Sequence, residues 1–257
     1  MQIIVNNILT NYQISGSGSK TLLLLHGWGS SSQAFSSLTG ELSSKFKIIS
    51  LDLPGMGKSE APQQIWDLDN YKNFILAFLL KLNLQKLDVI LGHSNGGTLA
   101  IKIASDQLTT KNLKLSKLIL VGSAGIRNQQ KTKKNIFKLV AKVGSAATSV
   151  LPASLQNKLK RKLYQAAGSE ALDNPALEQT FRKVVEEDIR NLAGKIKMPT
   201  LIIYGEDDTD TPPQFGEILA SEIQNAKLNI ISGAGHYVFL DQPEKTLNLI
   251  ERFINVK

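Results

Sequence analysis

The sequence predicts an α/β domain built on a mostly parallel sheet with helices on both faces. Short apolar runs of strand length alternate with segments of helical periodicity in the N-terminal half, and the alternation returns near the C-terminus. The runs are rich in Leu, Ile and Val at successive positions, which is typical of strands buried on both faces. A long segment between the two parts has no strand candidate and is strongly basic, which predicts a helical insertion.

The strand series is expected to begin with an edge hairpin over residues 2–5 and 9–14, with Asn6-Asn7 at the turn. The later expected strands are short and apolar: Thr21–Leu25, Lys47–Leu51, Leu87–Leu91, Lys117–Val121, Pro199–Tyr204 and Lys227–Ile231. Helical patterns lie between and after them: Ser31–Ser44, Leu68–Leu82, Asn95–Leu108, Pro212–Ile223 and Pro243–Asn255. We therefore expect residues 1–125 and 196–257 to form one core domain.

Residues 126–195 are expected to form the helical insertion, which would act as a cap. Apolar positions with helical spacing recur through it, and its last helix is expected over Pro175–Leu192. From Arg127 to Lys162 there are ten Lys or Arg and no Asp or Glu, whereas the whole chain has a net charge of +8. Two interpretations remain open: solvated helix faces, or a surface that steers an anionic substrate.

The composition excludes several classes of protein. The hydrophobic fraction of 42% and the charged fraction of 20% are ordinary for a globular chain, which argues against disorder. The absence of Cys excludes a disulfide framework, a thiolate metal site and a cysteine nucleophile. No apolar run approaches the roughly 20 residues of a membrane helix. The first 20 residues also lack the pattern of a signal peptide, so we expect a cytoplasmic protein.

The segment Gly92-His93-Ser94-Asn95-Gly96 lies directly between an expected buried strand and an expected helix. This is the G-x-S-x-G pattern in its strand–turn–helix context, where a sharp turn exposes the serine at the C-terminal end of the strand. A serine hydroxyl is a weak nucleophile until a base removes its proton. The pattern therefore predicts a nucleophilic Ser94 with a partner histidine.

Only three histidines are available: His26, His93 and His236. His93 adjoins Ser94, so its side chain is expected to leave the turn in another direction. His26 ends the first central strand beside glycine, which indicates a structural role. His236 lies in a glycine-rich loop after the last expected strand, where its imidazole can reach over the sheet edge, and it is the expected base.

An acid is needed to hold the imidazole in the correct tautomer and to stabilise its charged form. The segment from Glu206 to Asp210 places four carboxylates in five residues at the C-terminal end of an expected strand. Spacing alone does not choose between Asp207, Asp208 and Asp210.

Two segments are similar to phosphate-binding loops, but neither matches the full pattern. Gly55–Ser59 is similar to the end of such a loop, but Asp52 occupies the position of its first glycine. Gly16–Thr21 precedes a strand and has Thr21 where a dinucleotide-binding fingerprint needs its last glycine. No His or acid cluster has metal-ligand spacing, and the basic segment carries no recognisable nucleic-acid motif.

The chain order Ser, Asp, His is the order of the α/β-hydrolase superfamily, and the sequence resembles the small capped members of that superfamily. The resemblance covers the chain outside residues 126–195. It rests on four segments: Leu25–Trp28, Asp52–Ser59, Gly92–Gly96, and Gly205–Pro212 together with Gly235-His236. It implies an α/β-hydrolase fold.

The same resemblance implies roles for particular residues. Asp208 is the fourth residue of a G-x-x-D segment, which is the family's catalytic acid. Trp28 and Asn95 stand where the family's oxyanion hole takes its backbone N–H donors. The implied activity is that of a carboxylesterase-like serine hydrolase, in which Ser94 attacks the ester of a small or medium acyl group and His236 shuttles the proton.

The family also admits carrier-linked ester or thioester hydrolases, lactonases and C–C bond hydrolases, and some similar proteins only bind a ligand. We expect neither a cofactor nor a metal. The expected partner is a small-molecule ester rather than a nucleic acid or a membrane. The basic segment would favour an anionic ester.

Overall fold

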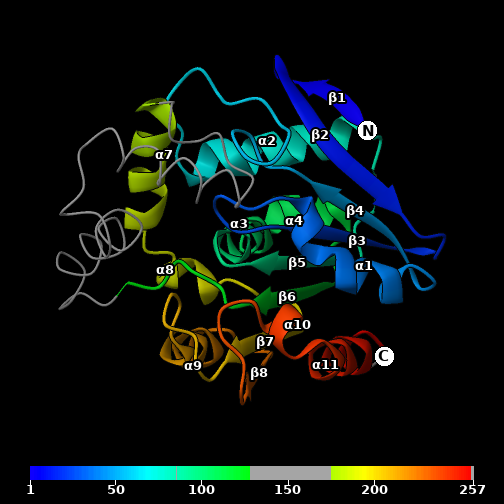
Figure 1. Ribbon diagram of the computed structural model, residues 1–257, viewed down its shortest axis with the longest axis vertical. Coiled ribbons are helices and arrows are strands. Elements are labelled where there is room, and N and C mark those ends of the chain that lie inside the picture. The colour runs from blue at the N-terminus through cyan, green and yellow to red at the C-terminus, as the bar shows by residue number, and fades with distance from the viewer. Residues whose placement is uncertain (85, 128–174, 256–257) are drawn as a thin grey trace, which may run out of the picture.

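The computed structural model describes residues 1–84, 86–127 and 175–255 (Figure 1). In this part of the chain, eight strands form one sheet in the order β1-β2-β4-β3-β5-β6-β7-β8. The strands are β1 (Gln2–Val5), β2 (Ile8–Ser15), β3 (Lys20–Leu25), β4 (Phe46–Leu51), β5 (Val89–His93), β6 (Lys117–Val121), β7 (Thr200–Gly205) and β8 (Ala226–Ile231). β2 pairs antiparallel with both β1 and β4, and all later pairs are parallel, so the predicted sheet is confirmed.

Helices cover both faces of this sheet (Figure 1). They are η1 (Ser32–Phe35), α1 (Ser36–Leu42), α2 (Leu68–Lys81), α3 (Asn95–Ala104), α4 (Gln107–Leu113), α7 (Pro175–Glu186), α8 (Arg190–Ala193), α9 (Pro213–Glu222), α10 (Val238–Asp241) and α11 (Pro243–Asn255). One apolar cluster takes residues from α2, α3, α8 and α9, and a second takes residues from α1, α10 and α11. The two clusters lie on opposite faces of the sheet because successive strand side chains point to opposite sides.

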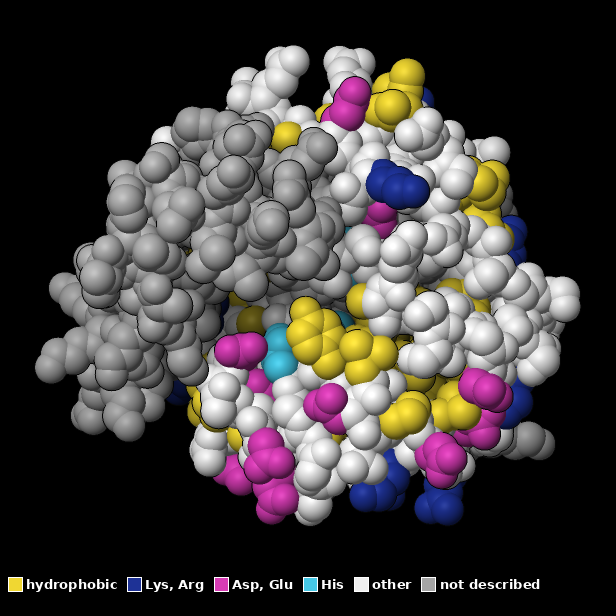
Figure 2. Space-filling view, in the orientation of Figure 1, with side chains coloured by type: hydrophobic (Ala, Val, Ile, Leu, Met, Phe, Trp, Pro, Cys, Tyr) yellow, Lys and Arg dark blue, Asp and Glu magenta, His cyan; other side chains and the backbone are white. Residues whose placement is uncertain are grey.

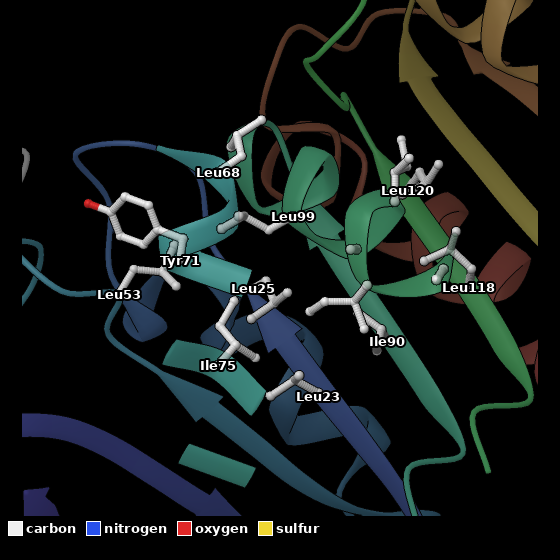
Figure 3. Close-up of a cluster of buried hydrophobic side chains, with 14 of the residues drawn as sticks. Leu23, Leu25, Leu53, Leu68, Tyr71, Ile75, Ile90, Leu99, Leu118 and Leu120 are labelled. Carbon is white, nitrogen blue, oxygen red and sulfur yellow. The ribbon is translucent and has the colours of Figure 1, made fainter. Parts of the chain in front are cut away.

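The central strand β3 shows this alternation directly. Leu23 and Leu25 belong to the first cluster, and Leu22 and Leu24 belong to the second. Figure 3 shows side chains of α2 and α3 packed over Leu23 and Leu25. All four leucines are buried, and each contributes about 2 kcal/mol of apolar burial. This packing fixes the strand ends that carry the candidate site.

The N-terminal hairpin is confirmed, and its turn has a clear conformational basis. Asn6 and Asn7 have φ values of 47° and 63°, which correspond to the left-handed region that two-residue hairpin turns require. Asparagine adopts this region more readily than most residues. The turn sets the antiparallel register in which Val5 lies opposite Ile8.

Several elements differ from the sequence-based expectation, among them the helix expected over residues 31–44, which divides into η1 and α1. The strand expected over Leu87–Leu91 is observed over Val89–His93, and it begins where Val89 pairs with Leu22 of β3 and Lys117 of β6. The helix expected over residues 95–108 splits into α3 and α4, because Asp106 Oδ1 accepts the N–H of Thr109, as a residue starting a new helix does. The helix expected over residues 175–192 likewise splits into α7 and α8.

β6 ends at Val121, and its parallel neighbour β7 begins at Thr200, so the segment expected as the insertion connects two adjacent strands. Its two ends are joined close to the sheet: Ile189 N–H donates to the Gly125 carbonyl at 2.9 Å, and Arg190 Nη2 donates to the Arg127 carbonyl at 3.0 Å. The expected basic helices over residues 127–162 lie outside the described residues, apart from Arg127. Of the described helices, none is long and apolar enough to cross a bilayer.

Candidate active site

Ser94 lies in a sharp turn between β5 and α3. Its backbone has φ 53° and ψ −120°, a conformation that costs free energy in any residue with a Cβ. The turn is held by neighbouring backbone, since Ser94 N–H donates to the Val121 carbonyl and the Ser94 carbonyl accepts the N–H of Ala124. A Cβ on Gly96 would lie 2.0 Å from the Leu25 carbonyl oxygen, so only glycine fits there. The half-buried Ser94 is thereby fixed at the C-terminal edge of the sheet.

Asp208 and His236 come together at the same edge. His236 Nδ1 lies 2.8 Å from Asp208 Oδ2. The Asp208 carboxylate is buried, and the His236 side chain is 12% exposed. Burial opposes ionisation of Asp208, but the hydrogen bonds from His236 and Thr211 outweigh it and hold the pKa of Asp208 below its ordinary value. An ionised Asp208 requires the imidazole to carry its proton on Nδ1, which leaves Nε2 as the proton acceptor.

Of the three carboxylates that spacing left open, the structure places only Asp208 against His236. Asp207 and Asp210 are exposed. Asp208 is instead turned inwards, because its Oδ1 accepts the backbone N–H groups of Asp210 and Thr211, each at 2.9 Å.

Thr211 is a site residue that sequence reasoning did not identify. Its buried hydroxyl oxygen lies 2.8 Å from Asp208 Oδ2, 2.9 Å from the Gly122 carbonyl oxygen and 3.1 Å from His236 Nδ1. The hydroxyl has one proton, so it donates to Asp208 or to Gly122 at any moment. Its position three residues after Asp208 was the available signal, since a hydroxyl there can close a turn on the carboxylate.

Two glycines let the His236 loop pass back over the ends of β6 and β7. A Cβ on Gly205 would lie 2.2 Å from the Ala234 carbonyl oxygen. Gly122 has φ +49°, and a Cβ there would lie 3.3 Å from both Asp208 Oδ2 and His236 Nδ1. The loop therefore occupies space that side chains at positions 122 and 205 would otherwise fill. This close approach brings His236 towards the C-terminal end of β5.

Ser94 Oγ makes no hydrogen bond to His236 among the described residues. The two residues are linked through His93, however, which precedes Ser94 in the chain and whose ring centroid lies 4.7 Å from that of His236. Hydrogen bonds between a nucleophile and its base are often long in unliganded enzymes and tighten in the complex.

The backbone N–H groups of Trp28 and Asn95 have no acceptor in the part of the chain that the structure describes. Asn95 is the first residue of α3, where N–H groups are left without helical partners. The Trp28 ring packs at 5.2 Å from Phe181 of α7 and at 6.2 Å from Tyr71, both measured between centroids. The helix α7 therefore lies directly beside the Trp28 segment.

His26 has the structural role that its glycine-rich surroundings indicated. It is fully buried, its Nε2 accepts the Leu53 N–H at 2.9 Å, and its Nδ1 donates to the Gly27 carbonyl at 2.8 Å. Burial lowers the pKa of His26, so it is neutral near pH 7. Both ring nitrogens are thus occupied by backbone.

The surface around the site is mixed in character. Figure 2 shows histidine atoms at the surface between acidic side chains on one side and apolar side chains on the other. Tyr237 and Leu240, which follow His236, are 38% and 52% exposed. No group of three or more His, Cys, Asp or Glu within the described ranges is placed to hold a metal ion.

The order and direction of the strands, with helices on both faces, are those of an α/β hydrolase. The chain belongs to that family, because a family model described as "alpha/beta hydrolase fold" matches residues 20–243. It is 27% identical to an uncharacterised hydrolase, YugF, of Bacillus subtilis over 97% of this chain and 94% of the relative. It is also 27% identical to a pimeloyl-[acyl-carrier protein] methyl ester esterase of Nitrosospira multiformis over 90% of this chain and 93% of the relative.

Solved structures with lower identity share the fold. The enol-lactonase of Burkholderia xenovorans superimposes with a TM-score of 0.79 at 19% identity over the full length of both chains. A meta-cleavage product hydrolase of Pseudomonas fluorescens gives a TM-score of 0.76 at 21% identity over 99% of this chain and 97% of that chain.

Proposed function

We propose that this α/β hydrolase cleaves a carboxylic ester through an acyl-enzyme formed on Ser94. The observation that carries the proposal is the Asp208–His236 pair, whose 2.8 Å hydrogen bond occupies Nδ1 and leaves Nε2 free to accept a proton. Ser94 stands at the same sheet edge in a strained, half-buried turn. A serine hydroxyl next to a correctly oriented imidazole is the arrangement that nucleophilic catalysis needs.

The proposed reaction has two halves. Ser94 Oγ attacks the ester carbonyl as His236 Nε2 takes its proton, and His236 returns that proton to the leaving alkoxide. Water then attacks the acyl-enzyme with His236 again as base, which releases the acid and restores Ser94. Asp208 stays ionised throughout and stabilises the charged imidazole, as its lowered pKa favours.

The oxyanion of each tetrahedral intermediate would be bound by the backbone N–H groups of Trp28 and Asn95. Their lack of an acceptor among the described residues supports this role. Each such donor contributes about 3 kcal/mol to transition-state stabilisation.

Residues 126–195 are proposed to form a cap that limits the acyl group to small or medium size. The packing of Phe181 and Leu177 of α7 against Trp28 and Gly55 supports a cap seated beside the oxyanion donors. Carrier-linked esters form the second substrate class to test, because the relatives include a methyl ester esterase of an acyl-carrier protein and residues 127–162 carry ten positive charges. Thioesters, lactones and C–C bonds are the remaining alternatives.

Fluorophosphonate labelling tests the nucleophile directly. Wild-type protein should carry the adduct on Ser94 by mass spectrometry, and Ser94→Ala should lose ester turnover by roughly 10⁴-fold or more. Ser105→Ala is the matched control, since Ser105 follows the same helix and its hydroxyl donates to the local Lys102 carbonyl. An adduct on another serine, or turnover retained in Ser94→Ala, would refute the proposal.

The acyl group can be assigned by a second measurement. Rates on p-nitrophenyl esters of increasing chain length should peak at a short or medium acyl group and fall for long chains. A methyl ester of a carboxylated acyl thioester of a carrier protein would test the second substrate class. A higher rate on a thioester or lactone than on every ester would move the assignment to that class.

A further inference from the structure

We propose that His93 is a positioning residue, which fixes the His236 loop to the Ser94 turn through one hydrogen bond. Its Nε2–H donates to the His236 backbone carbonyl at 3.0 Å. His93 precedes Ser94 in β5, so this bond joins the strand of the nucleophile to the residue that carries the base. The inference rests on the proposed function, because it gives His93 a role in the geometry of that same site.

The topology explains why such a connection matters. β5 and β8 are separated by β6 and β7, and neighbouring strands lie about 4.8 Å apart. His236, which follows β8, must therefore lie well away from its own strand to serve Ser94. Two other bonds, from Gly235 N–H to Asp241 Oδ2 and from Asp207 N–H to the Ala234 carbonyl, tie the loop to the β7–α10 side. The His93 hydrogen bond connects the same loop to β5.

Ring packing fixes the orientation of the donor. The His93 ring lies 4.7 Å from the His236 ring, 4.8 Å from the Tyr237 ring and 5.1 Å from the Phe239 ring. His93 is 1% exposed, so its ring is enclosed by these neighbours, and close packing restricts its movement. The direction of Nε2–H is thus set by the same residues that it holds in place.

His93 is also suited to remain a neutral donor while His236 gains and loses a proton. Its Nδ1 has no hydrogen-bond partner among the described residues, so a proton there would be buried without an acceptor. Three titratable groups interact with it: His236, Asp208 and His26. Burial first, and then charge on His236, lower the pKa of His93 to about 3. A neutral ring with its proton on Nε2 is the form that the geometry requires.

Two substitutions separate the hydrogen bond from the packing. In His93→Gln, the amide nitrogen lies the same number of bonds from Cα as Nε2 and can still donate. In His93→Met, an apolar methyl group takes that place with similar volume. If His93 only fills space, both variants should lose the same activity. If His93 holds the His236 carbonyl by its hydrogen bond, only His93→Met should lose activity.

The first measurement is turnover of p-nitrophenyl butyrate, with KM and kcat determined separately. His93→Met should lower kcat by about 10- to 100-fold, because a small displacement of the base slows proton transfer, with KM nearly unchanged. His93→Gln should recover kcat to within a few-fold of wild type. The rate of fluorophosphonate labelling at Ser94 should follow kcat. Equal losses in the two variants, or full activity in His93→Met, would overturn the proposal.

The second measurement needs no substrate and keeps the two proposals distinguishable. The chain has three histidines, so nitrogen-detected NMR of wild-type protein can assign each ring by single substitution. His93 should be neutral with its proton on Nε2 from pH 8 down to about pH 5. A proton on Nδ1, or titration of His93 in that range, would overturn the positioning role even if ester hydrolysis is found. If no ester is hydrolysed and Ser94 is not labelled, the proposed function fails, and this NMR result alone still decides the role of the His93 bond.

Discussion

The Asp52 turn and the Asp208 loop hold the same chemical group in different ways. Each follows a strand of the sheet, and each buries its carboxylate. Asp52 accepts the backbone N–H groups of Ser32 and Lys58 at 2.8 and 2.9 Å and the side-chain amide of Asn11 at 2.8 Å. Asp208 also accepts two backbone N–H groups, but its second oxygen faces the Thr211 hydroxyl and the His236 imidazole.

The difference lies in whether a partner can change its charge. Burial opposes ionisation of both carboxylates, yet their donors lower the pKa of each below its ordinary value of 3.8. The donors to Asp52 are permanent amides, so that carboxylate only closes the turn of residues 52–59. In the proposed reaction the imidazole beside Asp208 takes up a proton, so this carboxylate would stabilise the charged ring. A buried aspartate at a strand end is therefore not by itself a sign of an active site.

The largest effect is expected from Asp208→Asn. An amide at this position favours the wrong imidazole tautomer, so kcat should fall by about 10⁴-fold. Steady-state kinetics on the best ester would measure the loss, with circular dichroism to confirm folding. Asp207→Asn and Asp210→Asn serve as controls and should stay within about tenfold of wild type, because both side chains are exposed. Equal sensitivity of either neighbour would contradict the assignment of Asp208.

Asp52→Asn should reverse this pattern and act on stability. One of its oxygens would become an amide nitrogen facing N–H donors, so the free energy of unfolding should fall by about 3 kcal/mol. Chemical denaturation would measure the change. Turnover per folded molecule should stay within about tenfold of wild type. A loss of kcat as large as that of Asp208→Asn would remove the distinction between the two turns.

Acid should weaken the fold before it protonates the two carboxylates. The pKa of His26 and of His93 is lowered by burial, that of His93 to about 3, from an ordinary value of 6.5. The unfolded chain therefore binds more protons below about pH 6.5, and the free energy of unfolding should fall by up to about 1.4 kcal/mol per pH unit for each histidine.

The carboxylates add to this loss at lower pH. Their folded pKa values lie below 3.8, so the stability that they contribute is present above about pH 4 and disappears as the pH falls through those values. Urea titrations between pH 7 and pH 4 would measure the slope, and His93→Gln should reduce it. A flat stability between pH 7 and pH 5 would mean that neither imidazole is buried in its neutral form.

Thr211→Val should give the smallest effect of the four. Valine keeps the volume of threonine but removes the hydroxyl that lies 2.8 Å from Asp208 Oδ2. We expect kcat to fall by about tenfold, the value of one net hydrogen bond. Thr211→Ser retains the hydroxyl and is the matched control. An unchanged kcat in the valine variant would show that His236 and the backbone donors orient Asp208 without it.

Much of the fold follows from local sequence patterns, because runs of apolar residues predict the buried strands and glycine or asparagine predicts the turns between them. The hairpin turn at Asn6-Asn7 and the central strands agree with the expectation within two residues. Helix breaks were missed, because a side chain such as Asp106, which accepts the Thr109 N–H, satisfies backbone groups in a way that periodicity does not reveal. The short helix α10 was also missed, since four residues carry no periodic signal.

The candidate site likewise contains residues that local patterns predict and residues that depend on contacts between distant parts of the chain. The Ser94 turn and the His236 loop could be predicted from glycine spacing and from the scarcity of histidine. The choice of Asp208 needed the family resemblance, because its burial depends on Gly122 and His236, which are distant in the sequence. The contribution of His93 depends on a hydrogen bond between separate strand ends, which no spacing rule indicates. Thr211 had its position three residues after Asp208 as a signal, but its contact with the Gly122 carbonyl depends on the fold.

The strained backbone of Ser94 implies a trade-off between stability and the proposed activity of this protein. A residue with a Cβ at φ 53° and ψ −120° costs about 1–3 kcal/mol, and glycine would relieve that cost. A screen that selects only for heat resistance would therefore favour replacement of Ser94 by glycine, and with it a well-folded protein that has lost its nucleophile. Engineering for thermostability would have to select for turnover at the same time, because one available gain in stability lies at the residue that the proposed chemistry cannot lose.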